Sequence, residues 1–435
     1  MATPHPGASR LAAGEHPESG PEQARRLTGQ PVGRLFVGLY VLAIVGVWVA
    51  LLTPASVTLA LRIAELDPAG KASSLALVTG VGAIFAMVSN PVFGRLSDLC
   101  TSRWGRRRPF MVGGAACGVV SLLVIGVAPS IPIVLLGWCL TQVALNAAVA
   151  ALIAVLPDRV PEHRRGTVSG LMGMTNQVAQ VAGTFLVQFT GTRGPGMFLV
   201  PAVIGVVLVL AFACYLKEVP KTRAELPPLS WGDIPRSLWI NPLRHRDFAW
   251  AFFSRFLVWI GKSLLLTYKT YFLMDHLGYT SARAAAVLGW TMLILGIGVV
   301  VASNIAGWLS DVLRRRKIFI IAASLIFATG MVVIATSSTL TGFLVGVAIA
   351  GVGQGTYVGV DYALVASVLP DRDTGAAKGM GVFNIANALP QTVAPAIAPL
   401  FLAIGGGHNY TALYLSAGGF AIVGAIVAQL IRAVR

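Results

Sequence analysis

The chain has 435 residues, of which 56% are hydrophobic and only 11% are charged, and its mean hydropathy is +0.76. A soluble globular protein carries about 25% charged residues, so the composition excludes one, together with a largely disordered or collagen-like chain. The class that remains is a multi-pass membrane protein. The apolar runs are long and continuous rather than alternating, which also argues against an outer-membrane β-barrel.

Twelve apolar runs are long enough to cross a bilayer as helices. They cover residues 34–60, 72–94, 109–128, 131–156, 167–189, 196–216, 248–273, 283–308, 317–337, 340–369, 380–403 and 410–431. Twelve spans place both termini on one side, and 26 of the 33 Lys and Arg residues lie in the tails and loops of that side, against four in the opposite loops and three inside one span. The positive-inside rule therefore predicts a cytoplasmic (inner) membrane protein with both termini in the cytoplasm. The net charge of +16 then reflects topology and contact with anionic lipid, not nucleic acid.

An internal repeat divides the chain into two halves. The segment Gly94–Asp98 recurs at 307–311 and the segment Leu156–Arg159 recurs at 369–372, both at an offset of 213 residues. We therefore predict an all-α fold with two parallel six-helix repeats: a disordered cytoplasmic tail (1–30), a first bundle (31–216), a polar, Pro-rich cytoplasmic linker (217–247) and a second bundle (248–435). Parallel halves that enclose a site near the membrane midplane are typical of secondary transporters.

The first thirty residues lack the apolar core of a signal peptide. The four cysteines show neither a metal-ligand spacing nor a disulfide framework. A Gly-rich phosphate loop, a metal-ligand cluster and a nucleophile–base pair do not stand out either. We therefore expect no cofactor, no metal and no enzymatic activity.

The loop after the second span carries a family signature. The two-half plan and the segment Gly94–Asp98 resemble the major facilitator superfamily, and the longer stretch Ser97–Phe110 is similar to its sucrose and glycoside cation symporter branch, as are Leu51–Pro54 and Gln142–Asn146. The resemblance implies alternating access and a central cavity lined by the first, fourth, seventh and tenth helices. It also implies a cytoplasmic gate that links the two halves, formed by Gly94, Asp98, Arg103, Gly105, Arg106 and Arg107, with Asp311 and Arg314 as their counterparts in the second half. The alternative is that the arginines only determine topology.

One position departs from the sucrose branch. Plant-type sucrose carriers have Asp where this chain has Gln142, and an amide cannot take up a proton. The first bundle then has no carboxylate inside the membrane. Any proton coupling must depend on another residue.

Asp361, in the tenth span, is the one carboxylate predicted at membrane depth. A charge there costs at least about 2.5–3.5 kcal/mol, so it is normally paired or functional. Arg255, Lys262 and Lys269 in the seventh span repeat every seven residues and share one helical face, because that spacing rotates by only about 20°. Depth favours Arg255 as the partner, since both residues lie roughly 10–12 Å from the cytoplasmic end at 1.5 Å per residue. We predict that this pair couples transport to protons; the alternative is a permanent salt bridge between two helices.

The two lysines on the same face receive different predictions. Lys262 lies near the midplane, too deep to reach the interface easily. It is predicted to contact substrate, for example an anionic group; the alternatives are that it is a second partner of Asp361 or that it is only hydrated in the cavity. Lys269 is predicted to extend to the outer interface.

Amide and aromatic side chains repeat along helical faces. Lipid does not tolerate such faces, so they are expected to point inward, where amides suit a ligand with many hydroxyl groups and aromatic rings stack on sugars. The predicted substrate-binding residues are Tyr40, Gln142, Asn146, Asn176, Gln180, Lys262, Tyr268, Gln354, Tyr357, Asn384, Asn387 and Gln391. For each single amide, hydrogen bonding between helices is the alternative.

The sequence thus predicts a secondary transporter, a proton-coupled symporter for sugars or glycosides, that acts as a monomer. Its partners are a small-molecule substrate, a proton or other cation and the lipid bilayer. The competing prediction is a drug or secondary-metabolite efflux antiporter on the same fold.

Overall fold

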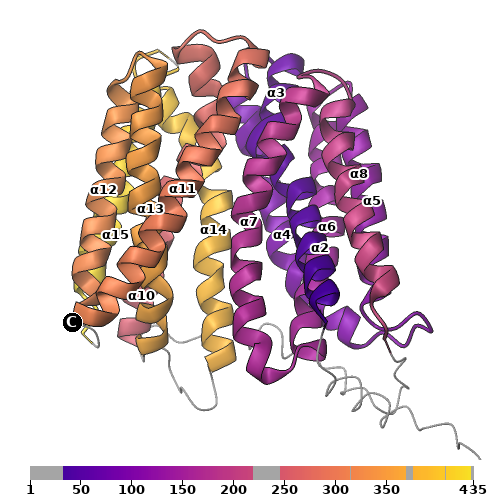
Figure 1. Cartoon of the computed structure of the whole chain (residues 1–435). Helices are drawn as coiled ribbons and strands as arrows, with labels where there is room; N and C mark the ends of the chain where they lie inside the picture. Colours follow the sequence, from indigo (N-terminus) through magenta and orange to yellow (C-terminus); the bar gives the residue numbers. More distant parts are fainter. Residues whose placement is uncertain (1–32, 219–244, 314, 369–375, 407, 433–435) are drawn as a thin grey trace, which may run out of the picture.

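The computed structural model describes residues 33–218, 245–313, 315–368, 376–406 and 408–432. In these residues the fold is entirely helical, with long helices that run side by side (Figure 1). The first helix begins and the last described residues end at the same end of the molecule (Figure 1). The predicted tail and most of the predicted linker lie outside the described residues.

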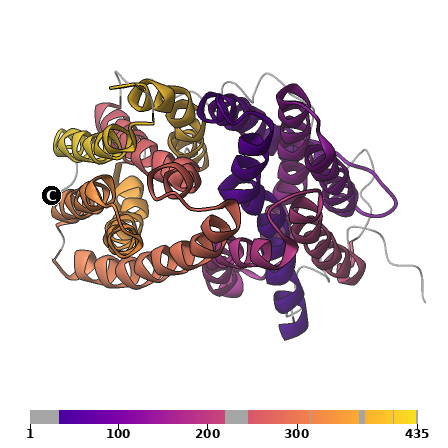
Figure 2. The same ribbon diagram turned by 90° about the horizontal axis from the view of Figure 1, so that it is seen from above.

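The helices form two groups, which Figure 2 shows side by side when seen from above. The first group comprises α2 (Arg34–Thr53), continued by η1 (Pro54–Thr58) and α3 (Leu59–Leu66), then α4 (Lys71–Asp98), α5 (Arg108–Val127), α6 (Ile131–Arg159), α7 (Glu162–Thr190) and α8 (Gly196–Tyr215). The second group comprises α10 (Arg246–Tyr271), continued by η3 (Phe272–His276), then α11 (Ser281–Leu313), α12 (Arg316–Thr336), α13 (Leu340–Val368), α14 (Ala376–Leu402) and α15 (Tyr410–Gln429). We call them the N-terminal and C-terminal bundles.

Eleven helices of the described chain are long and apolar enough to cross a membrane, and each corresponds to a predicted span. The predicted fifth span is also a long helix, α7, but it is not among the eleven. Its amides and hydroxyls, such as Asn176, Gln180 and Thr184, explain its low hydropathy. A polar helix of this kind is stable in a membrane only where other helices cover its polar side, and α7 packs against α2 in its own bundle and α11 in the other.

Close approach of α11 and α13 depends on glycine. A Cβ on Gly355 would lie 2.5 Å from the Val299 carbonyl oxygen, and one on Gly359 would lie 2.3 Å from that of Ser303. Small residues at such positions let helix backbones touch, which is how membrane helices gain packing energy without a hydrophobic driving force between them.

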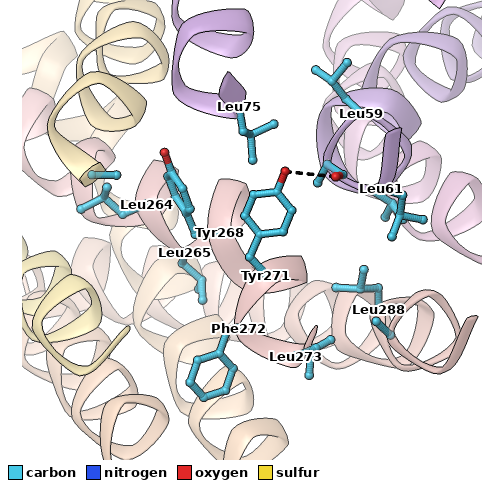
Figure 3. Packing of buried hydrophobic residues seen from close by; sticks show 14 of the residues in the cluster. Leu59, Leu61, Leu75, Leu264, Leu265, Tyr268, Tyr271, Phe272, Leu273 and Leu288 are labelled. Atoms are coloured by element: carbon cyan, nitrogen blue, oxygen red, sulfur yellow. Dashed lines mark hydrogen bonds between the residues drawn. The ribbon is translucent and has the colours of Figure 1, made fainter. Parts of the chain in front are cut away.

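The two bundles contact each other through α4 with α14 and α7 with α11, and also at the end of the molecule opposite the termini. There the Tyr271 hydroxyl donates to the Ala60 carbonyl (3.0 Å) and the Tyr268 hydroxyl donates to the Ala72 carbonyl (3.3 Å). Figure 3 shows both tyrosines between leucines of the two bundles. Lys71 of α4 forms an ion pair across the same contact with Asp275 of η3. These bonds hold the two bundles together at this end of the molecule, and we call this set of contacts the closed contact.

The short π-helix η1 contributes to that closure. It begins at Pro54, which has no N–H to donate to the helix. π-Helical turns of this kind often mark functional positions. The Ser56 carbonyl within η1 accepts hydrogen bonds from Lys269 Nζ (3.2 Å) and the Thr270 hydroxyl (3.4 Å) of the other bundle.

Candidate functional site

A buried ion pair lies in the C-terminal bundle. Arg255 Nη1 of α10 is 2.8 Å from Asp361 Oδ2 of α13, and the two side chains are only 2% and 4% exposed. Helical depth along the sequence had predicted this pairing, and the structure contains it. Its role in coupling stays a prediction, because the geometry alone also fits a permanent bridge between two helices.

The ion pair reaches a third helix and an aromatic neighbour. Arg255 Nε donates to the Asn387 side-chain oxygen of α14 (2.5 Å). The guanidinium lies 4.6 Å from the ring centroid of Phe383, also on α14, a cation–π contact. Tyr357, one turn before Asp361, donates a hydrogen bond to it. A change of charge at Asp361 would therefore alter the contacts that join α10, α13 and α14.

A small cavity lies beside this network, between α10, α12 and α13. Lys262, Gln354 and Tyr357, three of the predicted binding residues, line it. Trp259 lines it too, and the Lys262 ammonium lies 4.0 Å from the centroid of this indole. Sequence reasoning missed Ser324 of α12, because a single Ser in an apolar span gives no periodic signal.

Tyr40 does not line a cavity. It is fully buried in the apolar core of the N-terminal bundle, its ring 5.2 Å from that of Phe212, and its hydroxyl donates to the Leu152 carbonyl (2.8 Å). Because both the ring and the hydroxyl are taken, the predicted role in substrate stacking is not supported. Tyr268 is likewise occupied in the closed contact between the bundles.

The predicted amides that belong neither to the ion-pair network nor to the cavity divide into three kinds. Asn146 forms its hydrogen bonds within its own helix, where its Nδ2 donates to the backbone carbonyl and the side-chain oxygen of Gln142. Gln180 is buried and lies 3.4 Å from the Ser56 hydroxyl. The remaining two described amides, Asn176 and Gln391, are exposed. The side chain of Asn384 lies outside the described residues.

Lys269 departs from its prediction. It does not extend to the outer interface but is completely buried, and its ammonium donates to the carbonyls of Ser56 and Leu266. The prediction that Lys269 extends to the outer interface is wrong, because the helix continues beyond Lys269 as η3 and the N-terminal bundle covers this face.

At the opposite end of the molecule, the signature loop forms a cluster of charges. Arg107 is 4% exposed; its Nη2 lies 2.5 Å from Asp98, its Nε 3.0 Å from Asp158, and its Nη1 2.5 Å from the Ser97 hydroxyl. Arg106 forms a second ion pair with Asp158. These bonds join the ends of α4 and α6 to the start of α5.

The described bonds of this cluster stay within the N-terminal bundle, whereas the resemblance implied a link between the two halves. Arg103 is exposed, and Gly94 has open space around it. The side chain of Asp311 and the whole of Arg314 lie outside the described residues. A gating role for this cluster therefore stays a prediction.

Glu218, at the start of the predicted linker, holds the same loop. Its carboxylate accepts hydrogen bonds from the backbone N–H groups of Arg107 (3.0 Å) and Arg108 (3.2 Å), at the N-terminus of α5. Burial raises the pKa of this carboxyl, and the two N–H groups oppose that shift. Gly105 permits the approach, with φ of 96° and with Glu218 in the place that a Cβ would take. Nothing in the sequence pattern indicates this contact, because Glu218 lies 111 residues after Arg107 in the chain.

The chain is similar in sequence to known membrane transporters. The family model described as Major Facilitator Superfamily matches residues 70–377 and 251–435. An uncharacterised MFS-type transporter of Bacillus subtilis is 30% identical over 142 residues, which are 32% of this chain and 26% of that protein. A sucrose transport protein of Oryza sativa subsp. japonica is 27% identical over 189 residues, 34% of this chain and 35% of that protein. The matches thus span about a third or less of these relatives.

The fold also has solved counterparts. The crystal structure of a D-xylose-proton symporter superposes with a TM-score of 0.67 at 15% identity, and the match covers 92% of this chain and 98% of that symporter. At this level of identity the likeness concerns the fold alone.

Proposed function

This chain belongs to the Major Facilitator Superfamily, and from that premise we propose that it carries a small polar solute, a sugar or glycoside, across the cytoplasmic membrane by proton-coupled alternating access. The two bundles, 31–216 and 248–435, would rock against each other with the linker between them. The closed contact around Lys71, Asp275 and Tyr271 fits a state that is shut on the non-cytoplasmic side.

The observation that carries the coupling proposal is the buried pair of Arg255 and Asp361. Protonation of Asp361 removes its negative charge and weakens its hold on Arg255, which is also bonded to Asn387. Because α14 packs against α4 of the N-terminal bundle, such a change would act on a helix at the interface between the bundles. A proton can then bias the equilibrium between the two states by its differential affinity for them.

The substrate class rests on two supports. An amide, a phenol and an indole line the small cavity beside the ion pair, and these groups can hydrogen-bond to a single polar group of a larger solute. A sucrose transport protein is among the relatives, although the match covers about a third of each chain.

A proteoliposome assay with an imposed pH gradient tests the proposal across a panel of glycosides and lipophilic cations. Glycoside-driven proton entry is the expected result. Proton-driven expulsion of lipophilic cations would instead support an efflux antiporter. The amide at Gln142 favours this alternative, because the sucrose carriers have a carboxylate at that position. Absence of both activities in liposomes that contain correctly inserted protein would contradict the proposal.

A further inference from the structure

The charges around the cavity in the C-terminal bundle do not balance. Arg255 and Lys262 are two turns apart on one face of α10, and Asp361 is paired with Arg255. No described carboxylate forms an ion pair with Lys262. The contact described for its ammonium is the cation–π interaction with the Trp259 ring. At membrane depth, a cation–π interaction stabilises a charge less than a counter-ion does.

The same cavity holds polar groups that lack partners. The Ser324 hydroxyl and the Gln354 side-chain oxygen are buried and have no hydrogen-bond partner among the described residues, and both residues line the cavity with Lys262. Ser324 is 1% exposed and Gln354 is 9% exposed. A buried polar group without a partner is costly, so such groups normally meet a water or a ligand.

The size of the space limits the occupant. The volume that the centre of a water molecule can reach is about 20 Å³, and a cavity needs about 10–15 Å³ of such space to hold one water. The cavity therefore accepts one small group rather than a whole sugar. The remaining walls are apolar or aromatic, with Phe327 and Trp259 as the largest.

From the unbalanced charge, the unpartnered hydroxyl and the small space, we propose that the cavity between α10, α12 and α13 is an anion site that takes one small anionic group. Lys262 supplies the positive charge and Ser324 a hydroxyl donor. Gln354 supplies a donor when its amide turns its NH₂ group towards the cavity.

Two sources offer that chemistry: a halide ion from solution, or the carboxylate of a transported acidic sugar or glycoside. The second source rests on the proposed function, whereas the first does not. With Asp361 protonated, the net positive charge around Arg255 and Lys262 rises, so a bound anion would be held more strongly. The site would then link anion binding to proton binding.

A binding experiment on the full chain in nanodiscs tests the site without transport. The protein is prepared in sodium gluconate, and chloride, bromide, formate or acetate replaces gluconate at constant ionic strength while thermal unfolding and tryptophan fluorescence are recorded. We expect a saturable stabilisation and, with bromide, a saturable quenching. Response to halides identifies an ion from solution; response to the carboxylates alone identifies a substrate carboxylate.

The variants assign the response to the cavity. Lys262→Met is expected to weaken the response at least about tenfold, which corresponds to about 1.4 kcal/mol, and Ser324→Ala is expected to weaken it less. Lys217→Met, at an exposed lysine, is the matched control and should respond like the parent chain. Absence of a saturable response to every anion in the parent protein, or an equal response in Lys262→Met, would mean that the cavity holds only water. Because the parent protein is measured directly, the test stands even if one variant fails to fold.

Discussion

At the scale of single residues, the central feature is a cation and an anion buried together inside a membrane bundle. Removal of one partner from a buried pair is more damaging than replacement of both, because the partner that remains is an uncompensated charge. For Arg255 and Asp361, this asymmetry is measurable as a difference in stability between the single and the double variants, whereas the coupling role needs a transport measurement.

Asp361→Asn tests the coupling role. The amide keeps the shape and hydrogen-bonding capacity but cannot bind a proton. We expect uphill accumulation of substrate to fall to equilibrium while exchange of substrate between the two sides survives, measured by uptake and counterflow in proteoliposomes. Glu65→Gln, at a surface acid that pairs with Arg62, is the control and should keep accumulation. Accumulation that survives in Asp361→Asn would leave the pair only a structural role.

Stability provides an independent test of the same pair. Arg255→Met should lower the free energy of unfolding by about 3–5 kcal/mol, because Asp361 is left buried and unpaired. The double variant Arg255→Met with Asp361→Leu should recover most of this loss, as measured by thermal unfolding in detergent, and should remain uncoupled. If the double variant transported substrate uphill, coupling would have to depend on another group.

At the scale of elements, helix ends and close helix contacts are held by a few specific bonds. Glu218 follows α8 and binds the N-terminus of α5, where the first N–H groups of a helix have no partner within it. A negative charge also interacts favourably with the positive end of the helix dipole. This contact fixes the position at which the linker leaves the N-terminal bundle.

Gly105→Ala tests that contact. The residue has φ of 96°, which disfavours a side chain, and its Cβ would lie 2.1 Å from a Glu218 carboxylate oxygen. Strain and displacement of Glu218 should together cost about 1–3 kcal/mol, visible as a lower unfolding temperature. Gly113→Ala on α5, where a Cβ meets open space, is the matched control and should be neutral or slightly stabilising. Equal stability of the two variants would show that the approach of Glu218 is unimportant.

At the scale of the whole molecule, the two bundles meet through α4 with α14, α7 with α11, and the closed contact around η1, α3 and η3. The proposed alternating access requires that this closed contact opens in part of the cycle. Contacts made only in the closed state set its population, since a two-state equilibrium shifts by the free energy of the interactions removed.

Lys71→Met should therefore favour opening, because it removes the cross-bundle ion pair with Asp275. The readout is labelling of a cysteine at Thr58, which is buried behind the closed contact, by an impermeant maleimide in a cysteine-free background. We expect faster labelling in Lys71→Met. Arg62→Met, whose partners Glu65 and the Ala128 carbonyl lie in its own bundle, should leave the rate unchanged. Equal rates in both variants would mean that the ion pair does not hold the bundles closed.

Much of this arrangement was predictable from the chain alone. Long apolar runs fix where helices cross the membrane, so eleven of the twelve predicted spans appear as sufficiently apolar helices. The constant rise of a helix fixes depth, which is why Arg255 could be matched with Asp361. The cost of charge in a membrane made those two residues conspicuous in a sequence that is otherwise so apolar.

Only the tertiary structure decided which neighbour each polar face meets. Periodicity assigns a residue to a side of its helix but does not identify the helix that covers that side. Tyr40 and Lys269 are therefore buried against partners that the sequence does not indicate, and Ser324 lines a cavity without belonging to any pattern. Glu218 reaches back to a loop that precedes it by more than a hundred residues. Such contacts depend on how helices rotate and pack, which is set by side-chain shape across the whole bundle.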